Sequence, residues 1–150
     1  MLQTLLERAP AIEQQNDSWT PRQQEMCAAV AKSILVIEDD DGIRDILGDV
    51  LTEETIHQVF LAQDGKSCLN ILQTARPDLF LVDYRLPDIT GLELIERIRR
   101  IKGYEQTPVV LMSASLSREN ITRQHLRYLR KPFDLDRFLQ MVEEALTVED

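Results

Sequence analysis

The sequence has few of the residues that cross-link a small fold, with only two cysteines in 150 residues. Cys27 and Cys68 lie far apart and show no CxxC or Cys/His spacing, so we expect neither a disulfide framework nor a zinc site. No apolar run is long enough to span a bilayer, and Glu7 and Arg8 interrupt the N-terminal one. We therefore expect a cytoplasmic protein with no signal peptide and no membrane contact.

Positive charge is also scarce, because 17 Lys and Arg face 26 Asp and Glu and give a net charge of −9. This balance disfavours nucleic-acid binding, which needs a basic surface against the phosphates. The first 32 residues carry four acids and three bases (−1), whereas the rest carries 22 acids and 14 bases (−8). The sequence therefore predicts an N-terminal extension over 1–32 and one acidic domain over 33–150.

Within the extension, a Thr-Pro pair favours the start of a helix. We expect a helix over 21–32 and a shorter one over 2–8, and the single tryptophan, Trp19, lies in the linker between them. Docking of Trp19 on the domain or on a partner and partial cover within the linker are both compatible with the sequence.

Short apolar runs alternate with amphipathic segments throughout the domain, which is typical of βα units. The runs are almost continuously apolar, as in a parallel sheet covered on both faces. The sequence therefore predicts an α/β fold with a five-stranded, doubly wound parallel sheet. The expected strands are 34–37, 57–62, 79–83, 108–113 and 127–130, and the expected helical stripes are 43–51, 64–74, 95–101 and 135–146.

The expected strands end in polar residues. In ILVIEDDDG the first strand runs into Glu38 and Asp39, and the third strand ends at Asp83. The carboxyl ends of parallel strands meet at one edge, so these acids would make one another costly to ionise unless cations neutralise them. Oxygen ligands of this kind suit Mg²⁺. The same edge would receive Ser113 and Lys131, while Asp40 and Asp41 would begin the next helix.

From Ser33 to about Val148 the chain closely resembles the receiver domain of bacterial two-component response regulators. The matching pieces are, in order, ILVIEDDDGIRDIL, RPDLFLVDYRLPDITGLELIERIR, PVVLMSA and YLRKPF. The resemblance implies a flavodoxin-like strand order 2-1-3-4-5. It also implies a cytoplasmic phosphoprotein of a two-component phosphorelay.

The resemblance assigns Asp83 as the phosphoacceptor, which takes a phosphoryl group from a sensor histidine kinase or a phosphotransfer protein and forms an aspartyl phosphate. Asp39 would bind Mg²⁺ directly and Glu38 would bind it through water. Asp83 and the main-chain carbonyl of Arg85 would complete the metal site. The protein would assist its own phosphorylation and dephosphorylation without acting as an enzyme on a separate substrate.

In the same resemblance Lys131 neutralises the phosphoryl oxygens. Ser113 hydrogen-bonds the new phosphoryl group, and Tyr128 is the aromatic residue that turns inward in the switching step. The output would be a change of conformation that controls a partner protein. We expect no DNA-binding output domain, and the sequence does not identify the partner.

Two features depart from the family pattern. Only 18 positions separate Ser113 from Lys131, and the usual Gly-Ala pair is missing, so we expect a shortened fourth helix. Receivers commonly use this face for homodimers and output partners. Here it would carry either a basic docking patch or a solvated surface, with Arg123, Arg127 and Arg130.

Arg85 and Ser115 occupy the positions that influence hydrolysis of the phosphoryl group in receivers, and neither is suited to positioning water. We therefore expect a phosphorylated form that is not unusually short-lived. For two further groups the sequence favours structural roles. Asp88 and Gly91 would form a turn and a helix start. The arginines of the 95–101 stripe would form a solvated helix face, and they are Arg97, Arg99 and Arg100.

Two alternative functions stay open from the sequence. A phosphohydrolase of the haloacid-dehalogenase type would use Asp39 as its nucleophile and Asp41 as its acid, with Ser113 and Lys131 in its later motifs. That interpretation leaves Asp83 without a role. The other alternative is a receiver fold that acts as a scaffold independently of phosphorylation.

Overall fold

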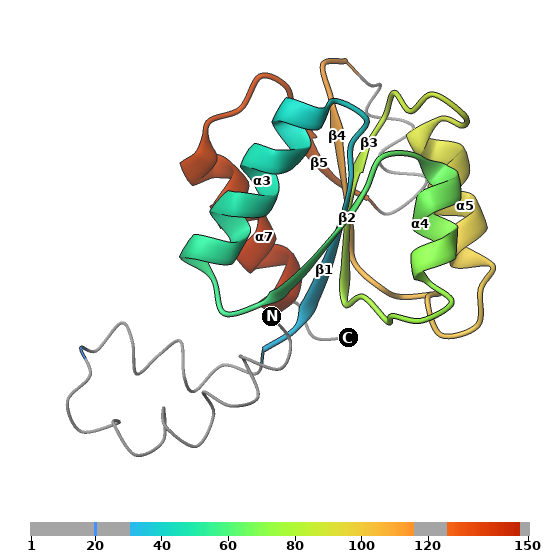
Figure 1. Cartoon of the computed structure of the whole chain (residues 1–150), viewed down its shortest axis with the longest axis horizontal. Coiled ribbons are helices and arrows are strands. Elements are labelled where there is room, and N and C mark those ends of the chain that lie inside the picture. The colour runs from blue at the N-terminus through green and yellow to red at the C-terminus, as the bar shows by residue number, and fades with distance from the viewer. Residues whose placement is uncertain (1–19, 21–30, 116–125, 148–150) are drawn as a thin grey trace.

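The computed structural model describes residue 20 and residues 31–115 and 126–147 (Figure 1). The predicted helices over 2–8 and 21–32 lie outside the described residues, apart from the last two positions of the second one. Trp19, Arg123 and the predicted short fourth helix between Ser113 and Lys131 lie outside them too, so these expectations stay predictions.

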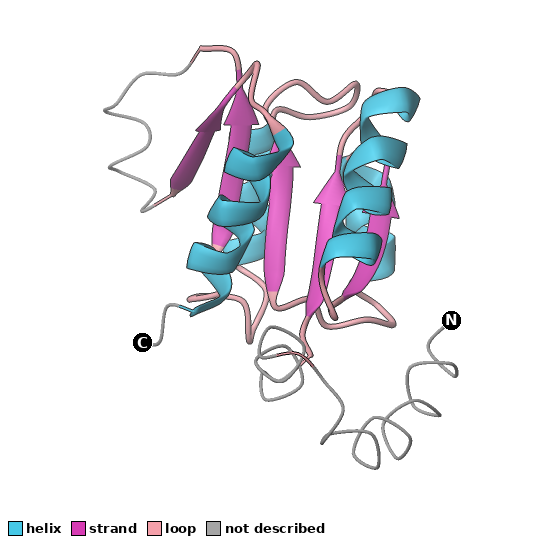
Figure 2. Ribbon diagram, turned by 90° about the vertical axis from the view of Figure 1, so that its left-hand side faces the viewer, coloured by secondary structure: helices cyan, strands magenta, loops and turns pink. Residues whose placement is uncertain are grey.

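Five parallel strands form the central sheet, in the order β2-β1-β3-β4-β5. Their arrowheads all point to the same edge (Figure 2). This confirms the predicted strand order 2-1-3-4-5. The bounds are β1 Ser33–Ile37, β2 Gln58–Ala62, β3 Leu79–Asp83, β4 Val109–Ser113 and β5 Arg127–Arg130.

Helices cover both faces of the sheet, with α3 and α7 on one side and α4 and α5 on the other (Figure 1). Carboxylate and hydroxyl side chains cap three of them, because Asp40, Asp64 and Thr90 each accept a backbone N–H in the first turn. The predicted helix-starting role of Asp40 is thus confirmed. The bounds are α3 Asp41–Glu54, α4 Gly65–Ile71, α5 Gly91–Arg99 and α7 Leu135–Thr147.

Each predicted apolar stripe overlaps a helix, but four of the apolar residues in these stripes are exposed. Ile46 and Ile43, in the first two turns of α3, are 53% and 38% exposed, and Leu135 and Ile101 are also exposed. Leu135 begins α7 and Ile101 lies just past the end of α5, whereas Ile46 lies in the second turn of α3, directly before the buried Leu47. The central residues of the stripes are buried, as Leu47 shows.

Two apolar layers fix the sheet between its helices. One contains Phe138 of α7 and the other contains Phe80 of β3, whose ring meets Tyr104 edge-on at 5.5 Å between centroids. Full burial of an aliphatic or Phe side chain contributes roughly 1.5 to 3 kcal/mol, and every residue of β3 and β4 is buried. The strand ends are therefore held firmly, and so are the polar residues that follow them.

Among the described residues, no helix is both long enough and apolar enough to cross a membrane.

Candidate functional site

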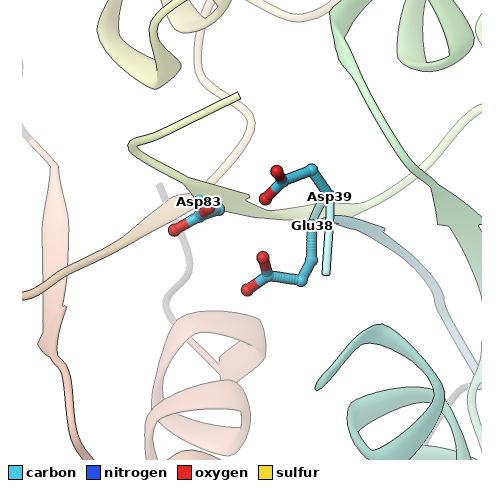
Figure 3. Close-up of side chains that lie close together, drawn as sticks. All are labelled: Glu38, Asp39 and Asp83. Atoms are coloured by element: carbon cyan, nitrogen blue, oxygen red, sulfur yellow. The ribbon is translucent and has the colours of Figure 1, made fainter. Parts of the chain in front are cut away.

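Three carboxylates meet at the carboxyl edge of the sheet. Glu38 and Asp39 directly follow β1, and Asp83 is the last residue of β3. One oxygen atom from each lies within 4.8 Å of the others, and the side chains face a common space (Figure 3). Glu38 and Asp83 are only 1% and 5% exposed, whereas Asp39 lies at the surface. The structure thus brings together the acids that the sequence placed at one edge.

Lys131 is the cation of this cluster. Its Nζ donates to Glu38 Oε1 at 2.9 Å and to Asp83 Oδ1 at 3.0 Å. One ammonium against three carboxylates leaves an excess of negative charge in a mostly buried place. Such an excess makes further negative charge unfavourable and a proton or a metal cation favourable.

The pKa shifts of the two partners follow from this imbalance. Burial raises the pKa of Glu38, and the neighbouring Asp83 raises it further against the opposing effect of Lys131. Burial alone would lower the pKa of Lys131, but its hydrogen bonds to Glu38 and Asp83 outweigh burial and raise it. Lys131 therefore stays protonated at neutral pH, and a divalent cation would relieve the remaining repulsion among the acids.

The donor set fits Mg²⁺. This ion takes oxygen ligands at about 2.0 to 2.1 Å in an octahedron, so opposite ligands lie about 4.2 Å apart. The carboxylate oxygens of Glu38, Asp39 and Asp83 lie within 4.8 Å of one another, which is close enough for the three acids to hold one ion among them directly or through water. The exposed position of Asp39 leaves the site open to solvent.

The loop after β1 is held by contacts that the sequence did not reveal. Arg44 Nη1 donates to the backbone carbonyl of Glu38 at 2.8 Å, and the Asp40 N–H donates to Glu38 Oε2 at 3.3 Å. Arg44 also pairs with Asp41. The spacing of three residues between Asp41 and Arg44 could have suggested their ion pair. The contact of Arg44 with a carbonyl six residues earlier depends on the folded loop.

Gly91 is another residue whose role the sequence analysis missed. It begins α5 as predicted, but a Cβ at this position would lie 2.6 Å from the carbonyl oxygen of Asp83 and 2.9 Å from Tyr84 Cα. Its N–H donates to the Tyr84 carbonyl at 2.7 Å. Glycine is therefore required here because α5 packs directly on the backbone that carries Asp83.

Ser113 and Tyr128 lie beside the cluster and contact each other. The Tyr128 hydroxyl donates to the carbonyl of Ser113 at 2.9 Å, and the Lys131 N–H donates to the same carbonyl at 2.9 Å. The Ser113 hydroxyl donates to the carbonyl of Ser115 at 2.9 Å. One backbone carbonyl thus links the predicted switch residues to the lysine of the site.

Other predicted residues lie around this centre. Arg85 is exposed in the loop after β3, where its backbone forms an isolated bridge with Thr90. Arg127 lies 4.0 Å from Glu144 of α7, and Arg130 is exposed. Asp41 is exposed at the start of α3 and pairs with Arg44, so it does not join the carboxylate cluster as the hydrolase alternative would require.

Asp88 lies in the bend before α5, as the predicted turn requires, and it has a further role there. Its carboxylate accepts from the N–H groups of Gly65 and Lys66, each at 3.0 Å, and so ties the loop after β3 to α4. One structural interpretation needs correction. Arg99 is not a solvated residue. Its guanidinium is half-buried and donates to the carbonyls of Tyr104 and Thr107, because the chain after α5 folds back over it.

Comparison with known proteins agrees with this geometry. The sequence model of the response regulator receiver domain matches residues 34–143. Sporulation initiation phosphotransferase F of Bacillus subtilis is 32% identical over 122 residues, which are 79% of this chain and 96% of that protein. The transcriptional regulatory protein AfsQ1 of Streptomyces coelicolor is 44% identical over 82 residues, which are 55% of this chain and 35% of that protein.

Solved structures show the same fold. The chemotaxis protein CheY4 of Vibrio cholerae superimposes with a TM-score of 0.72 at 26% identity, over 78% of this chain and all of that one. This chain belongs to the response regulator receiver domain family. Receiver domains serve two-component signalling: they interact with histidine kinases or phosphotransfer proteins, and they typically bind Mg²⁺ at an acidic pocket. Family membership removes the haloacid-dehalogenase alternative.

Proposed function

We propose that the chain is a phosphoacceptor in a two-component phosphorelay and that Asp83 receives the phosphoryl group. The observation that carries the proposal is the position of Lys131, whose ammonium bridges the buried carboxylates of Glu38 and Asp83. A carboxylate held against a fixed cation, with two more acids beside it, is suited to phosphoryl transfer, where positioning and charge stabilisation dominate.

In the proposed step, one Asp83 oxygen attacks the phosphorus of a phosphohistidine on a kinase or a phosphotransfer protein. The O–P bond forms as the P–N bond breaks, and the bonding electrons return to the imidazole nitrogen, which takes a proton from solvent. Lys131 Nζ, already 3.0 Å from Asp83 Oδ1, stays beside the new phosphoryl oxygens and balances their charge.

The proposed metal ligands are Asp39 directly, Glu38 through water, Asp83, and the main-chain carbonyl of Arg85. Bound Mg²⁺ would supply positive charge toward the transferring phosphoryl oxygens. Glu38 and Asp39 directly follow the buried strand β1, which fixes where their carboxylates lie. Arg44 holds the backbone carbonyl of Glu38. The chain thus prepares the ligand geometry before transfer begins.

The proposed switch runs through Ser113. Its hydroxyl donates to the Ser115 carbonyl in the unphosphorylated chain and would turn to the phosphoryl group after transfer. This rotation would move the backbone carbonyl of Ser113, which Tyr128 and Lys131 both contact. The change would then reach β5 and the face that includes Arg127 and Arg130. That face would dock a downstream protein or a second copy of the chain.

Arg85 and Ser115 flank the site without an acid or amide group that could hold an attacking water. The Ser115 carbonyl is already engaged by the Ser113 hydroxyl. We therefore propose that the phosphorylated form is not unusually short-lived. A decay as fast as that of the quickest receivers would contradict this part of the proposal.

The test is the intact mass of the full chain after incubation with Mg²⁺ and a small acyl phosphate donor. We expect one added phosphoryl group in the wild type and none in Asp83→Asn or in the presence of a chelator. Asp49→Asn, which removes an exposed acid from α3, is the matched control and should be phosphorylated normally. Folded wild-type protein that gains no phosphoryl group would reject the proposal and favour the scaffold alternative.

A further inference from the structure

A groove lies at the end of the sheet opposite Asp83. It has a volume of about 700 Å³ and is formed by the loops that precede β1, β3 and β4 together with the end of α7. The start of β1 and the end of α7 lie at this same end of the molecule (Figure 1). Its buried lining residues are Pro77, Tyr104, Ala145 and Leu146, and its more exposed ones include Lys32, Arg76 and Gln106.

The exposed rim of the groove is basic although the domain is acidic. Lys32 and Arg76 line it beside a single acid, Asp78, whose carboxylate accepts from the Ser33 N–H at 2.9 Å. The Arg76 guanidinium lies 5.5 Å from the centroid of the Tyr104 ring, and no described carboxylate forms an ion pair with it. The rim therefore presents a guanidinium that an acidic segment could pair with.

Lys32 fixes where the preceding chain leaves the domain. Its N–H donates to His57 Nδ1 at 3.0 Å, its carbonyl accepts from Gln58 N–H at 2.9 Å, and its Nζ donates to the Leu146 carbonyl at 3.2 Å. Because Lys32 itself lines the groove, the segment before it starts at the groove's edge. That segment, residues 1–31, carries four acids and two bases, so its charge is opposite to that of the rim.

We propose that this groove binds the chain's own residues 1–31, with acids of the segment at Lys32 and Arg76 and Trp19 against the apolar lining. Trp19 is 13 residues from Lys32, which is roughly 45 Å of extended chain and enough to reach any part of the groove. A short tether gives an effective concentration of the order of mM, so even weak contacts suffice for docking.

The proposed docking is distinct from the phosphoryl chemistry. The groove and the carboxylate cluster lie at opposite ends of β1, whose five residues span about 17 Å. Docking therefore does not require phosphorylation, and it can be tested in the unphosphorylated chain. A protein that captured residues 1–31 would uncover the groove for another ligand.

The experiment measures acrylamide quenching of Trp19, the only tryptophan, in the 150-residue chain. Docking predicts a quenching constant about twofold or more below that of the same chain unfolded in guanidinium. Gln106→Glu adds an acid to the groove without changing side-chain size and should raise the constant toward the unfolded value. Gln140→Glu, an exposed site on α7 outside the groove, is the matched control and should change nothing.

A second pair of charge variants tests the proposal independently of Gln106→Glu. Arg76→Glu should release Trp19 as Gln106→Glu does, while Arg137→Glu, at an exposed position of α7, should not. Circular dichroism confirms that each variant is folded. Quenching as strong as in the unfolded chain would overturn the proposal. Protection of Trp19 from quenching that neither groove variant reduces would also overturn it. Protection that disappears on dilution would overturn it too, because the groove would then hold the segment of a second copy.

Discussion

The two ends of the sheet use charged side chains in opposite ways. At the carboxyl edge, Glu38 and Asp83 are buried against a single ammonium, and the local charge is not balanced. At the other end, the exposed Asp78 and the half-buried Lys32 bind backbone groups of neighbouring loops, and no buried carboxylates gather there among the described residues. Polar residues thus complete the fold at one end, whereas at the other they leave it in need of a cation.

The difference shows which contacts indicate function. Hydrogen bonds from side chains to loop carbonyls and N–H groups are common at the ends of strands and stabilise connections. Acids from two separate strands that converge on one lysine disfavour the isolated fold unless a ligand neutralises them. The excess of negative charge therefore distinguishes the site more clearly than the presence of a groove, which the opposite end of the sheet also has.

Replacing the lysine at each end gives the largest expected contrast. Lys131→Ala should slow phosphorylation by the acyl phosphate donor by about 10²- to 10³-fold, because one fixed charge beside the transferring group is lost. Lys32→Ala should leave the rate unchanged, since its Nζ binds the Leu146 carbonyl. Rates come from intact mass against time. Equal phosphorylation rates in the two variants would contradict the claim that only the lysine at the carboxyl edge of the sheet acts in phosphoryl transfer.

Mg²⁺ should stabilise the carboxyl edge selectively. At a concentration of 100 times its dissociation constant, a ligand that binds only the folded state adds about 2.7 kcal/mol to the free energy of unfolding. Asp39→Asn should lose most of this gain, and the control Asp49→Asn should keep it. Thermal melting with and without Mg²⁺ measures the effect. An undiminished gain in Asp39→Asn would show that the ion binds elsewhere.

Gly91→Ala should damage the site through packing alone. The added Cβ would lie 2.6 Å from the Asp83 carbonyl oxygen, so the backbone must move, at a cost of about 1 to 3 kcal/mol. Phosphorylation should slow as Asp83 shifts. Gly42→Ala, whose nearest contact is the Asp40 carboxylate at 3.3 Å, should have a smaller effect. Urea unfolding and phosphorylation rates together test this, and equal losses in both variants would contradict it.

The smallest effect concerns His57, at the opposite end. Burial lowers its pKa from the ordinary value of 6.5, Lys32 lowers it further, and Glu143 and Asp78 oppose the change. The unfolded chain therefore binds the proton more readily, so this contribution to stability is complete above pH 6.5 and is lost as the pH falls below it. His57→Gln should show a smaller drop in melting temperature on acidification. An identical drop would assign the pH dependence to other groups.

Much of the fold and site could be predicted from the sequence, because strand ends in a parallel sheet meet at one edge. That rule placed Glu38, Asp83 and Lys131 together, and the structure confirms their contacts. Contacts between distant loops could not be predicted in this way. Asp88 binds the start of α4 and Gly91 packs on the backbone of Asp83 only after the elements have docked.

The burial of individual helix residues was the other limit. Periodicity shows which side of a helix is apolar, but it does not show which residues on that side the neighbouring elements cover. Ile46 continues the stripe of α3 and is nevertheless 53% exposed. The prediction for Arg99 is wrong in the opposite direction. A charged residue on a helix predicts solvent exposure, but the following loop covers the Arg99 side chain.

The central claim is that the phosphoryl group enters at Asp83, and the direct measurement is the position of the modification. Borohydride reduces an aspartyl phosphate to homoserine, so peptide mass mapping of the reduced, phosphorylated chain identifies the acceptor. The account predicts homoserine at Asp83 and an unmodified Asp39. Homoserine at Asp39 with Asp83 unchanged would contradict it and would make the end of β1, not β3, the origin of the nucleophile.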